Sequence, residues 1–238
     1  MTTISDEVAR YIEDAGIPIS TVVGHAPRFM RRHAVARLCA QYEVYKLILD
    51  VKGSVVECGI HHGAGLFTWA HLSETLEPYA THRHIVGFDT FTGFTTVNEK
   101  DAGGTENSEL YAGGFQGSSL DDMKKSIAIF ERHRHQNGTA KIRLIPGDAT
   151  QTIPNFIEDN KHTVVALLYL DFDLYEPTKA AIESFLPRMP KGAVICFDEI
   201  NHSAWPGETM ALLETIGISS LRIRKFPFER DLAYAVIE

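Results

Sequence analysis

Acidic residues follow four apolar segments of the sequence, and they are the side chains best suited to chemistry. The four segments span residues 84–88, 141–145, 163–170 and 193–197, and each predicts a buried strand. The acids that follow them are Asp89, Asp148, Asp171 with Asp173, and Asp198 with Glu199. In an open sheet of parallel strands the ligand lies outside the carboxyl ends of the strands. We therefore expect these acids to meet around one site.

Three of these acids, Asp171, Asp198 and Glu199, form a group without an obvious balancing lysine nearby in the sequence. Carboxylates alone would repel one another, and a hard divalent cation resolves that repulsion. Mg²⁺ takes a few carboxylate oxygens and keeps water or substrate oxygens at its other positions. The three acids are therefore predicted metal ligands. The alternative for any single acid is that it caps the helix that follows it.

A glycine turn follows another apolar segment, residues 54–60, in the pattern Glu57-x-Gly59-x-x-x-Gly63. Glycine lets the backbone approach a ligand closely, because it has no Cβ and tolerates positive φ. The spacing matches neither G-x-G-x-x-G nor the phosphate loop G-x-x-x-x-G-K-[ST]. An acid two residues before the first glycine suits a ligand with a cationic amino acid end, such as S-adenosylmethionine. Asp89 then suits the ribose hydroxyls and Asp148 the adenine amino group. A tight turn without a ligand is the alternative.

Strands and helices that alternate along the chain would position these residues. The expected strands are 54–60, 84–89, 141–145, 163–170, 193–197, 221–228 and 232–238. The expected helices are 4–16, 34–49, 66–76, 118–135, 150–159, 177–185 and one that opens near residue 205. This order predicts an α/β fold with a mostly parallel sheet and helices on both faces. The last two strands are joined by a short turn, so one of them must run antiparallel.

A single domain is expected over residues 1–238, because the length suits one hydrophobic core. Residues 1–50 are expected to form a helical cap over the ligand edge. Residues 95–117 are polar and rich in glycine, which predicts a lid loop that orders over substrate. Within the cap, Arg28, Arg31 and Arg32 are either solvated surface or contacts for an anionic substrate group.

Composition narrows the class of partner. The net charge of −8 argues against a phosphate backbone or an anionic membrane, so we expect neither nucleic acid nor membrane as a partner. The three cysteines form no C-x-x-C pair, which favours core packing in a reducing compartment. The N-terminus lacks a basic region followed by an apolar core, and no apolar run approaches membrane-spanning length. These features predict a cytoplasmic protein.

Five segments between about residues 51 and 208 carry a family resemblance. They are Val56-Glu57-Cys58-Gly59-x-x-x-Gly63, Gly87-Phe88-Asp89-Thr90-Phe91-x-Gly93-Phe94, Gly147-Asp148-Ala149, Leu170-Asp171-Phe172-Asp173-Leu174-Tyr175-Glu176-Pro177-Thr178 and Phe197-Asp198-Glu199. With these motifs the sequence resembles the macrocin/mycinamicin O-methyltransferase family, and the fourth motif is the most specific. Glu199 stands where that family often has Asp, and Phe172 where it often has Gly.

The resemblance implies a Rossmann-like class I methyltransferase fold that uses S-adenosyl-L-methionine and Mg²⁺. The implied reaction is methyl transfer to a hydroxyl of a sugar or glycosylated natural product. Asp171 is then both a metal ligand and the catalytic base, and Asp198 and Glu199 complete the metal site. The implied cofactor-binding residues are Glu57, Gly59, Gly63, Asp89, Thr90, Phe91, Asp148, Ala149 and Asp171. A small-molecule acceptor and a homo-oligomer are also expected.

Other functions stay open on sequence grounds. A metal-dependent O-methyltransferase of a catechol-like diol would use a similar set of acids, because a catechol and a sugar both offer vicinal hydroxyls. A non-catalytic homologue would bind a nucleotide without turnover. An NAD-dependent oxidoreductase is disfavoured, because the third glycine of the dinucleotide fingerprint is missing.

Overall fold

A seven-stranded sheet forms the centre of the protein in the computed structural model, which describes residues 3–104 and 107–238. The strands are β1 (Ser54–Cys58), β2 (Ile85–Asp89), β3 (Ile142–Pro146), β4 (Val165–Leu170), β5 (Val194–Phe197), β6 (Arg224–Lys225) and β7 (Ala233–Val236). Their order in the sheet is β3-β2-β1-β4-β5-β7-β6. Strands β1 to β5 are parallel, and β7 runs antiparallel to both β5 and β6. The predicted α/β fold with an antiparallel C-terminal hairpin is confirmed.

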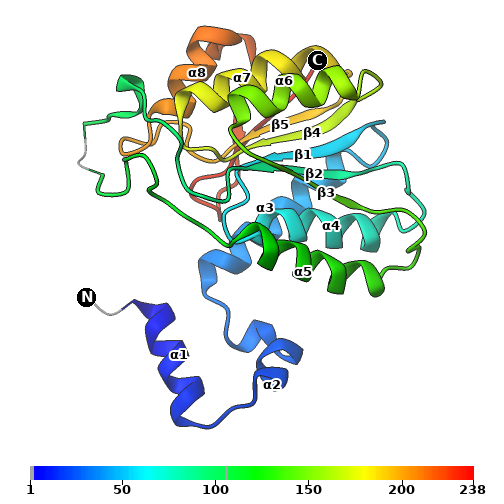
Figure 1. The fold of residues 1–238 in the computed structure, drawn as a ribbon, viewed down its shortest axis with the longest axis vertical. Coiled ribbons are helices and arrows are strands. Elements are labelled where there is room, and N and C mark those ends of the chain that lie inside the picture. The colour runs from blue at the N-terminus through cyan, green and yellow to red at the C-terminus, as the bar shows by residue number, and fades with distance from the viewer. Residues whose placement is uncertain (1–2, 105–106) are drawn as a thin grey trace.

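Helices cover both faces of the sheet (Figure 1). On one face lie α3 (Arg32–Leu47), α4 (Ala64–Leu76) and α5 (Leu120–Arg132), and on the other lie α6 (Ala149–Asp159), α7 (Tyr175–Phe185) and α8 (Gly207–Thr215). Each face buries its own apolar cluster against the sheet. All six residues of β4 are buried, as expected for a parallel strand covered on both faces.

The order in which successive strands are added to the sheet reverses between β1 and β4. The chain runs outward from β1 through β2 to β3, and then returns to place β4 on the other side of β1. In open α/β sheets such a switch point leaves a crevice outside the carboxyl ends of the strands. The glycine turn after β1 and the acids after β4 therefore flank the position where this fold type binds ligands.

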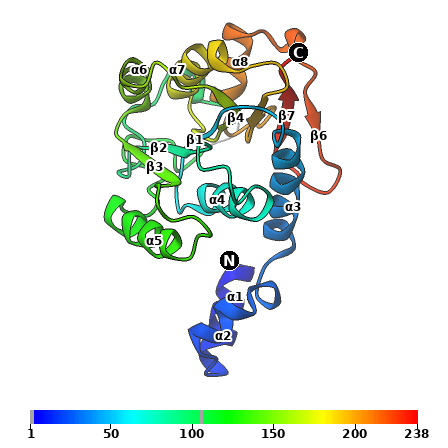
Figure 2. The ribbon, with the colours of Figure 1, turned by 90° about the vertical axis from the view of Figure 1, so that its right-hand side faces the viewer.

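The first two helices differ from the expected cap. Helices α1 (Ile4–Asp14) and α2 (Ile19–Gly24) lie apart from the sheet, beyond the end of α3 (Figures 1 and 2). Neither contains a buried residue, whereas α3 buries Ala40, Gln41, Val44 and Tyr45. In this structure residues 4–24 therefore do not lie over the carboxyl edge of the sheet.

Helix α2 was not expected from the sequence, since six residues are too few to show a helical period. The same holds for four short 3₁₀ helices: η1 (Ala26–Arg28), η2 (Glu99–Asp101), η3 (Leu186–Arg188) and η4 (Ile218–Ser220). Within the described residues, no helix combines the length and the apolar character needed to cross a bilayer.

Candidate active site

A pocket of about 310 Å³ opens at the carboxyl edge of the sheet. Its walls come from the segments that follow β1, β2, β3, β4 and β5. Six acids line it: Asp89, Asp148, Asp171, Asp173, Asp198 and Glu199. The strand-end acids therefore do meet around one cavity, as the parallel sheet order requires.

The glycine turn brings β1 close to β4. Gly59 has a φ of +96°, and a Cβ on it would lie 1.9 Å from the carbonyl oxygen of Asp171. Any other residue would push apart the ends of the two strands. Gly63, with a φ of +84°, is the residue from which α4 begins. Gly59 lines the pocket, whereas Gly63 packs against Met123.

Glu57, expected at the cofactor, is buried instead, with 1% of its surface exposed. Its carboxylate lies against Gly65 at the start of α4, and its Oε2 has no hydrogen-bond partner among the described residues. Burial raises the pKa of Glu57 well above its ordinary value, and the Leu66 amide opposes that rise. Glu57 therefore supports the turn from behind, and it does not line the cavity.

Asp89 lines the pocket and also holds the turn together. Its Oδ2 accepts hydrogen bonds from the amides of Ile60 at 2.7 Å and His61 at 2.9 Å, and its Oδ1 accepts from the Phe91 amide at 2.7 Å. Of its two neighbours in the expected cofactor set, Thr90 lines the pocket and Phe91 is buried in the core. Phe91 thus has a packing role in this structure.

Asp148 both caps a helix and lines the pocket. Its Oδ1 accepts from the Thr150 amide at 2.9 Å at the start of α6, and its Oδ2 accepts from the Thr95 hydroxyl at 3.3 Å. Ala149 lines the pocket beside it. The two interpretations of this acid, helix cap and ligand contact, are therefore compatible.

The carboxylate oxygens of Asp171, Asp173 and Glu199 lie within 4.8 Å of one another. Burial is the main cause that raises the pKa of all three, and neighbouring carboxylates add to it; the pKa of Asp173 is raised to about 8. Glu199 Oε2 is buried and has no hydrogen-bond partner among the described residues. Three close carboxylates with an unpaired oxygen fit a hard divalent cation.

Asp198, expected in that group, is bound to an arginine instead. Arg37 of α3 forms an ion pair with Asp198 Oδ1, and the Tyr169 hydroxyl donates to the same oxygen at 2.9 Å. Asp173 takes the place of Asp198 in the close trio. The sequence did not reveal Arg37 as a partner, because it is far from Asp198 along the chain and lies in the middle of a helix.

Glu208 is a further buried acid that sequence reasoning missed. It is fully buried at the start of α8, and its Oε1 accepts from the Glu199 amide at 2.9 Å. Burial raises its pKa well above the ordinary value. By holding the Glu199 backbone, Glu208 fixes one carboxylate of the trio.

The expected lid, residues 95–117, is fixed to the body at several points; Thr105 and Glu106 lie outside the described residues. Asp101, which is buried, accepts from the Tyr175 amide at 2.6 Å at the start of α7. Lys100 forms an ion pair with Glu214 at 2.7 Å. Asn107 donates to the carbonyl of Ala204 at 3.1 Å. Ordering of this segment over substrate stays a prediction.

Comparisons with known proteins agree with this architecture. Residues 56–200 match a family model described as a methyltransferase domain. The crystal structure of CalS11, a calicheamicin methyltransferase, superposes with a TM-score of 0.91 and 34% identity, over 98% of this chain and 91% of that one. The apo structure of CalS11, described as a TDP-rhamnose 3'-O-methyltransferase, gives 0.83 and 33% over 98% and 92%.

Two more distant proteins also match. A curated relative from Streptomyces olivaceus is 8-demethyl-8-(2,3-dimethoxy-alpha-L-rhamnosyl)-tetracenomycin-C 4'-O-methyltransferase. It is 28% identical over 161 residues, which span 67% of this chain and only 58% of the relative. The O-methyltransferase NovP, at 18% identity and a TM-score of 0.64 over 85% of this chain and 80% of that one, shows the same fold.

Proposed function

The chain belongs to the methyltransferase family, and we therefore propose that it transfers the methyl group of S-adenosylmethionine to a hydroxyl of a sugar or glycosylated natural product. We further propose that Mg²⁺ assists the reaction at the carboxylate trio.

The observation that carries the proposal is the trio of Asp171, Asp173 and Glu199, which faces into the same pocket as the glycine turn. Together with Asp198 and Glu208, the trio gathers five carboxylates, and among the described residues the one arginine bonded to them is Arg37. A divalent cation would supply the missing positive charge. Asp171, Asp173 and Glu199 would hold it, and Asp198 lines the same pocket.

The cofactor would occupy the wall formed by Gly59, Asp89, Asp148 and Ala149. Asp89 suits the ribose hydroxyls, although it already accepts three amide hydrogen bonds. Asp148, which lines the pocket, suits an exocyclic amino group. Glu57 would act on the cofactor through the turn that it supports.

The protein's part in methyl transfer is to orient the acceptor and to receive its proton. A bound divalent cation would lower the pKa of an acceptor hydroxyl. Asp171 follows the fully buried strand β4, so its backbone is held rigidly at the pocket. We assign to it the role of the base that takes the hydroxyl proton. The hydrogen bond from the Glu199 amide to Glu208 holds Glu199 in position as a proposed metal ligand.

The acceptor class follows from the relatives. CalS11 is described as acting on TDP-rhamnose, and the Streptomyces olivaceus protein is named for a rhamnosyl tetracenomycin. A sugar hydroxyl is what the two names share. For the expected homo-oligomer, support comes from residues 4–49, which hold more than half of the exposed large apolar side chains found among the described residues.

Asp171→Asn tests the proposal, because asparagine keeps the shape but cannot act as the base. General base catalysis is typically worth 10²–10⁴-fold, so turnover should fall by about a hundredfold or more. Binding of S-adenosylhomocysteine, measured by calorimetry, should stay near that of the parent. Asp159→Asn, an exposed aspartate at the end of α6, is the matched control and should keep parent activity.

Metal removal completes this test. Excess EDTA should abolish turnover of the parent, and Mg²⁺ should restore it. Near-normal turnover in Asp171→Asn, or full parent activity in excess EDTA, would contradict the mechanism.

A further inference from the structure

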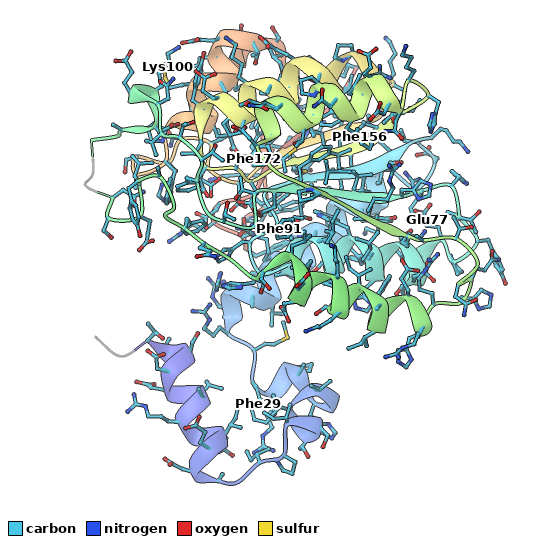
Figure 3. The ribbon with its side chains drawn as sticks, in the orientation of Figure 1. Phe29, Glu77, Phe91, Lys100, Phe156 and Phe172 are labelled. Carbon is cyan, nitrogen blue, oxygen red and sulfur yellow. The ribbon has the colours of Figure 1, made fainter. Side chains whose placement is uncertain are left out.

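The N-terminal arm, which we define as residues 3–31, contains α1, α2 and η1 but no buried residue. The first buried residue of the described chain is Ala40, in the middle of α3. Phe29, near the end of the arm, lies well away from the labelled residues of the body (Figure 3). Isolated helices shorter than about 12–15 residues are marginal in water. Helices α1 and α2, with 11 and 6 residues, therefore need a packing partner to stay folded.

The arm exposes large apolar side chains at helical spacing. Ile4 and Tyr11 are exposed on α1, and Ile19 and Val23 on α2 are 71% and 72% exposed. Residues four or seven apart share one face of a helix, so each pair lies on one side of its helix. Single exposed apolar residues are normal, whereas a group of them on one segment marks an interaction surface.

Helix α3 has two apolar faces, and only one of them is buried in the core. The other face carries Val35, Leu38, Cys39 and Tyr42, which are all exposed and which we term the α3 stripe. Their spacing of i, i+3, i+4 and i+7 is that of a helix face which packs against another element. Within one copy the arm lies beyond the end of α3 and not along this stripe (Figures 1 and 2).

The charges of these two surfaces are complementary. Helix α1 carries four acids and a single base: Asp6, Glu7, Glu13, Asp14 and Arg10. Residues 15–42 contain no Asp or Glu, and Arg28, Arg31 and Arg32 are exposed near the start of α3. The acidic helix and the basic segment belong to the same chain but lie apart within one copy. A second copy of this chain therefore matches both surfaces at once.

We propose that two copies of the chain exchange their N-terminal arms, so that the arm of each copy packs on the α3 stripe of the other. The acids of α1 then lie beside the arginines at the start of the other copy's α3. A two-fold axis relates the two contacts, so they form together. One side of a stable interface takes about 20–30 residues, and the unburied run from residue 3 to residue 39 is long enough to supply them. The inference rests on the homo-oligomer expected above, and it is independent of the proposed methyl transfer.

Sedimentation equilibrium tests the interface, and the parent should have twice the mass of one chain. Val23→Asp and Leu38→Asp should each raise the Kd of the dimer by about tenfold or more, because each buries a carboxylate without a partner. Neither residue belongs to the core, so the variants should keep the far-ultraviolet circular dichroism of the sheet and its helices. Ile129→Asp is the matched control, since Ile129 is 54% exposed on α5, and it should keep the parent Kd.

A charge exchange separates a second copy from an arm that folds back on its own chain. One variant combines Glu7→Lys with Asp14→Lys, and the other combines Arg31→Glu with Arg32→Glu. Each variant alone places like charges together at both contacts, so its dimer should be weakened. In an equimolar mixture both contacts again pair opposite charges. The mixture should therefore form the dimer that neither variant forms alone.

Cys39 gives a second measurement that does not depend on mass. It is the exposed cysteine of the three and lies within the α3 stripe, whereas Cys58 and Cys196 are buried. A thiol reagent such as 5,5'-dithiobis(2-nitrobenzoic acid) should react slowly with the parent dimer, because the other copy's arm covers Cys39. The same reagent should react severalfold faster with Val23→Asp.

Four results would overturn the inference. A monomeric parent would refute the second copy as partner without bearing on methyl transfer, and its binding to phosphatidylcholine vesicles would assign the arm to a lipid surface. An oligomer whose Kd is unchanged in Val23→Asp and Leu38→Asp would refute this interface alone. Failure of the mixed charge variants to associate would show that the arm does not bind a second copy. Equal reactivity of Cys39 in the parent and in Val23→Asp would show that the α3 stripe is not covered.

Discussion

Replacement of Arg37 by alanine should destabilise the protein strongly, because its ion pairs are buried. Arg37 Nε donates to Glu229 at 3.0 Å, Nη1 donates to the Tyr169 hydroxyl at 2.7 Å, and Nη1 also pairs with Asp198. The side chains of Asp198 and Glu229 are only 13% and 3% exposed. The Arg37→Ala variant would leave both carboxylates buried without their cation.

The expected loss of stability can be estimated from the hydrogen bonds that the two carboxylates would keep. Removing one partner of a buried ion pair costs about 3–5 kcal/mol. Asp198 would keep the hydrogen bond from Tyr169, and Glu229 would keep that from the Asp231 amide at 2.9 Å, so the lower limit applies. A loss of about 3 kcal/mol corresponds to a melting temperature lower by about 6–12 °C for a chain of this length.

Arg230→Ala is the matched control. Arg230 pairs with Asp231 at 2.6 Å, but its side chain is 83% exposed. An exposed pair is worth less than about 1 kcal/mol. Urea denaturation of the two variants measures both effects under one condition. If Arg37→Ala and Arg230→Ala lowered the free energy of unfolding equally, this would refute the conclusion that the Arg37 ion pairs stabilise the protein more because they are buried.

Two further predictions concern the glycine turn. Glu57→Gln should flatten the dependence of stability on pH. The pKa of Glu57 is raised in the folded protein, so the parent loses stability as the pH rises from the ordinary glutamate value towards the folded one, and the glutamine variant lacks that loss. Thermal denaturation between about pH 5 and pH 8 checks this, and a constant difference between the two proteins would contradict it. Asp89→Ala removes an acceptor of three amide hydrogen bonds and should weaken binding of S-adenosylhomocysteine by about tenfold or more. Calorimetry measures the change, and an unchanged affinity would show that Asp89 does not contribute to cofactor binding.

The sequence predicted most of the fold because its signals are local. Strands β1 to β5 are short apolar runs bounded by glycine, proline or acids, and β4 is apolar throughout. The positions of α1 and α2 could not be predicted in the same way, since half-buried Val8 and Ile12 define an amphipathic pattern but not what it packs against. Tertiary placement depends on surfaces that no local pattern encodes.

Individual side chains at the site were harder to assign than the edge on which they lie. The spacing Glu57-x-Gly59 suggested a ligand contact, but Glu57 points behind the turn. Phe115 and Trp205 come from loops far apart in the sequence, and nothing in the order of residues joins them. Contacts of this kind arise only when the strands bring their loops together.

The six acids that line the pocket differ in their hydrogen-bond and ion-pair partners, and the sequence motifs alone do not show this difference. Three are already satisfied by the protein: Asp89 by backbone amides, Asp148 by the start of α6, and Asp198 by Arg37 and Tyr169. No arginine, lysine or backbone amide within the described residues donates to the other three, Asp171, Asp173 and Glu199, and these are the acids whose oxygens converge within 4.8 Å. In sequence all six look alike, as acids at the ends of strands. Since only acids left without a donor gain from an added cation, the pattern of satisfied partners favours one metal position over the alternatives at this edge.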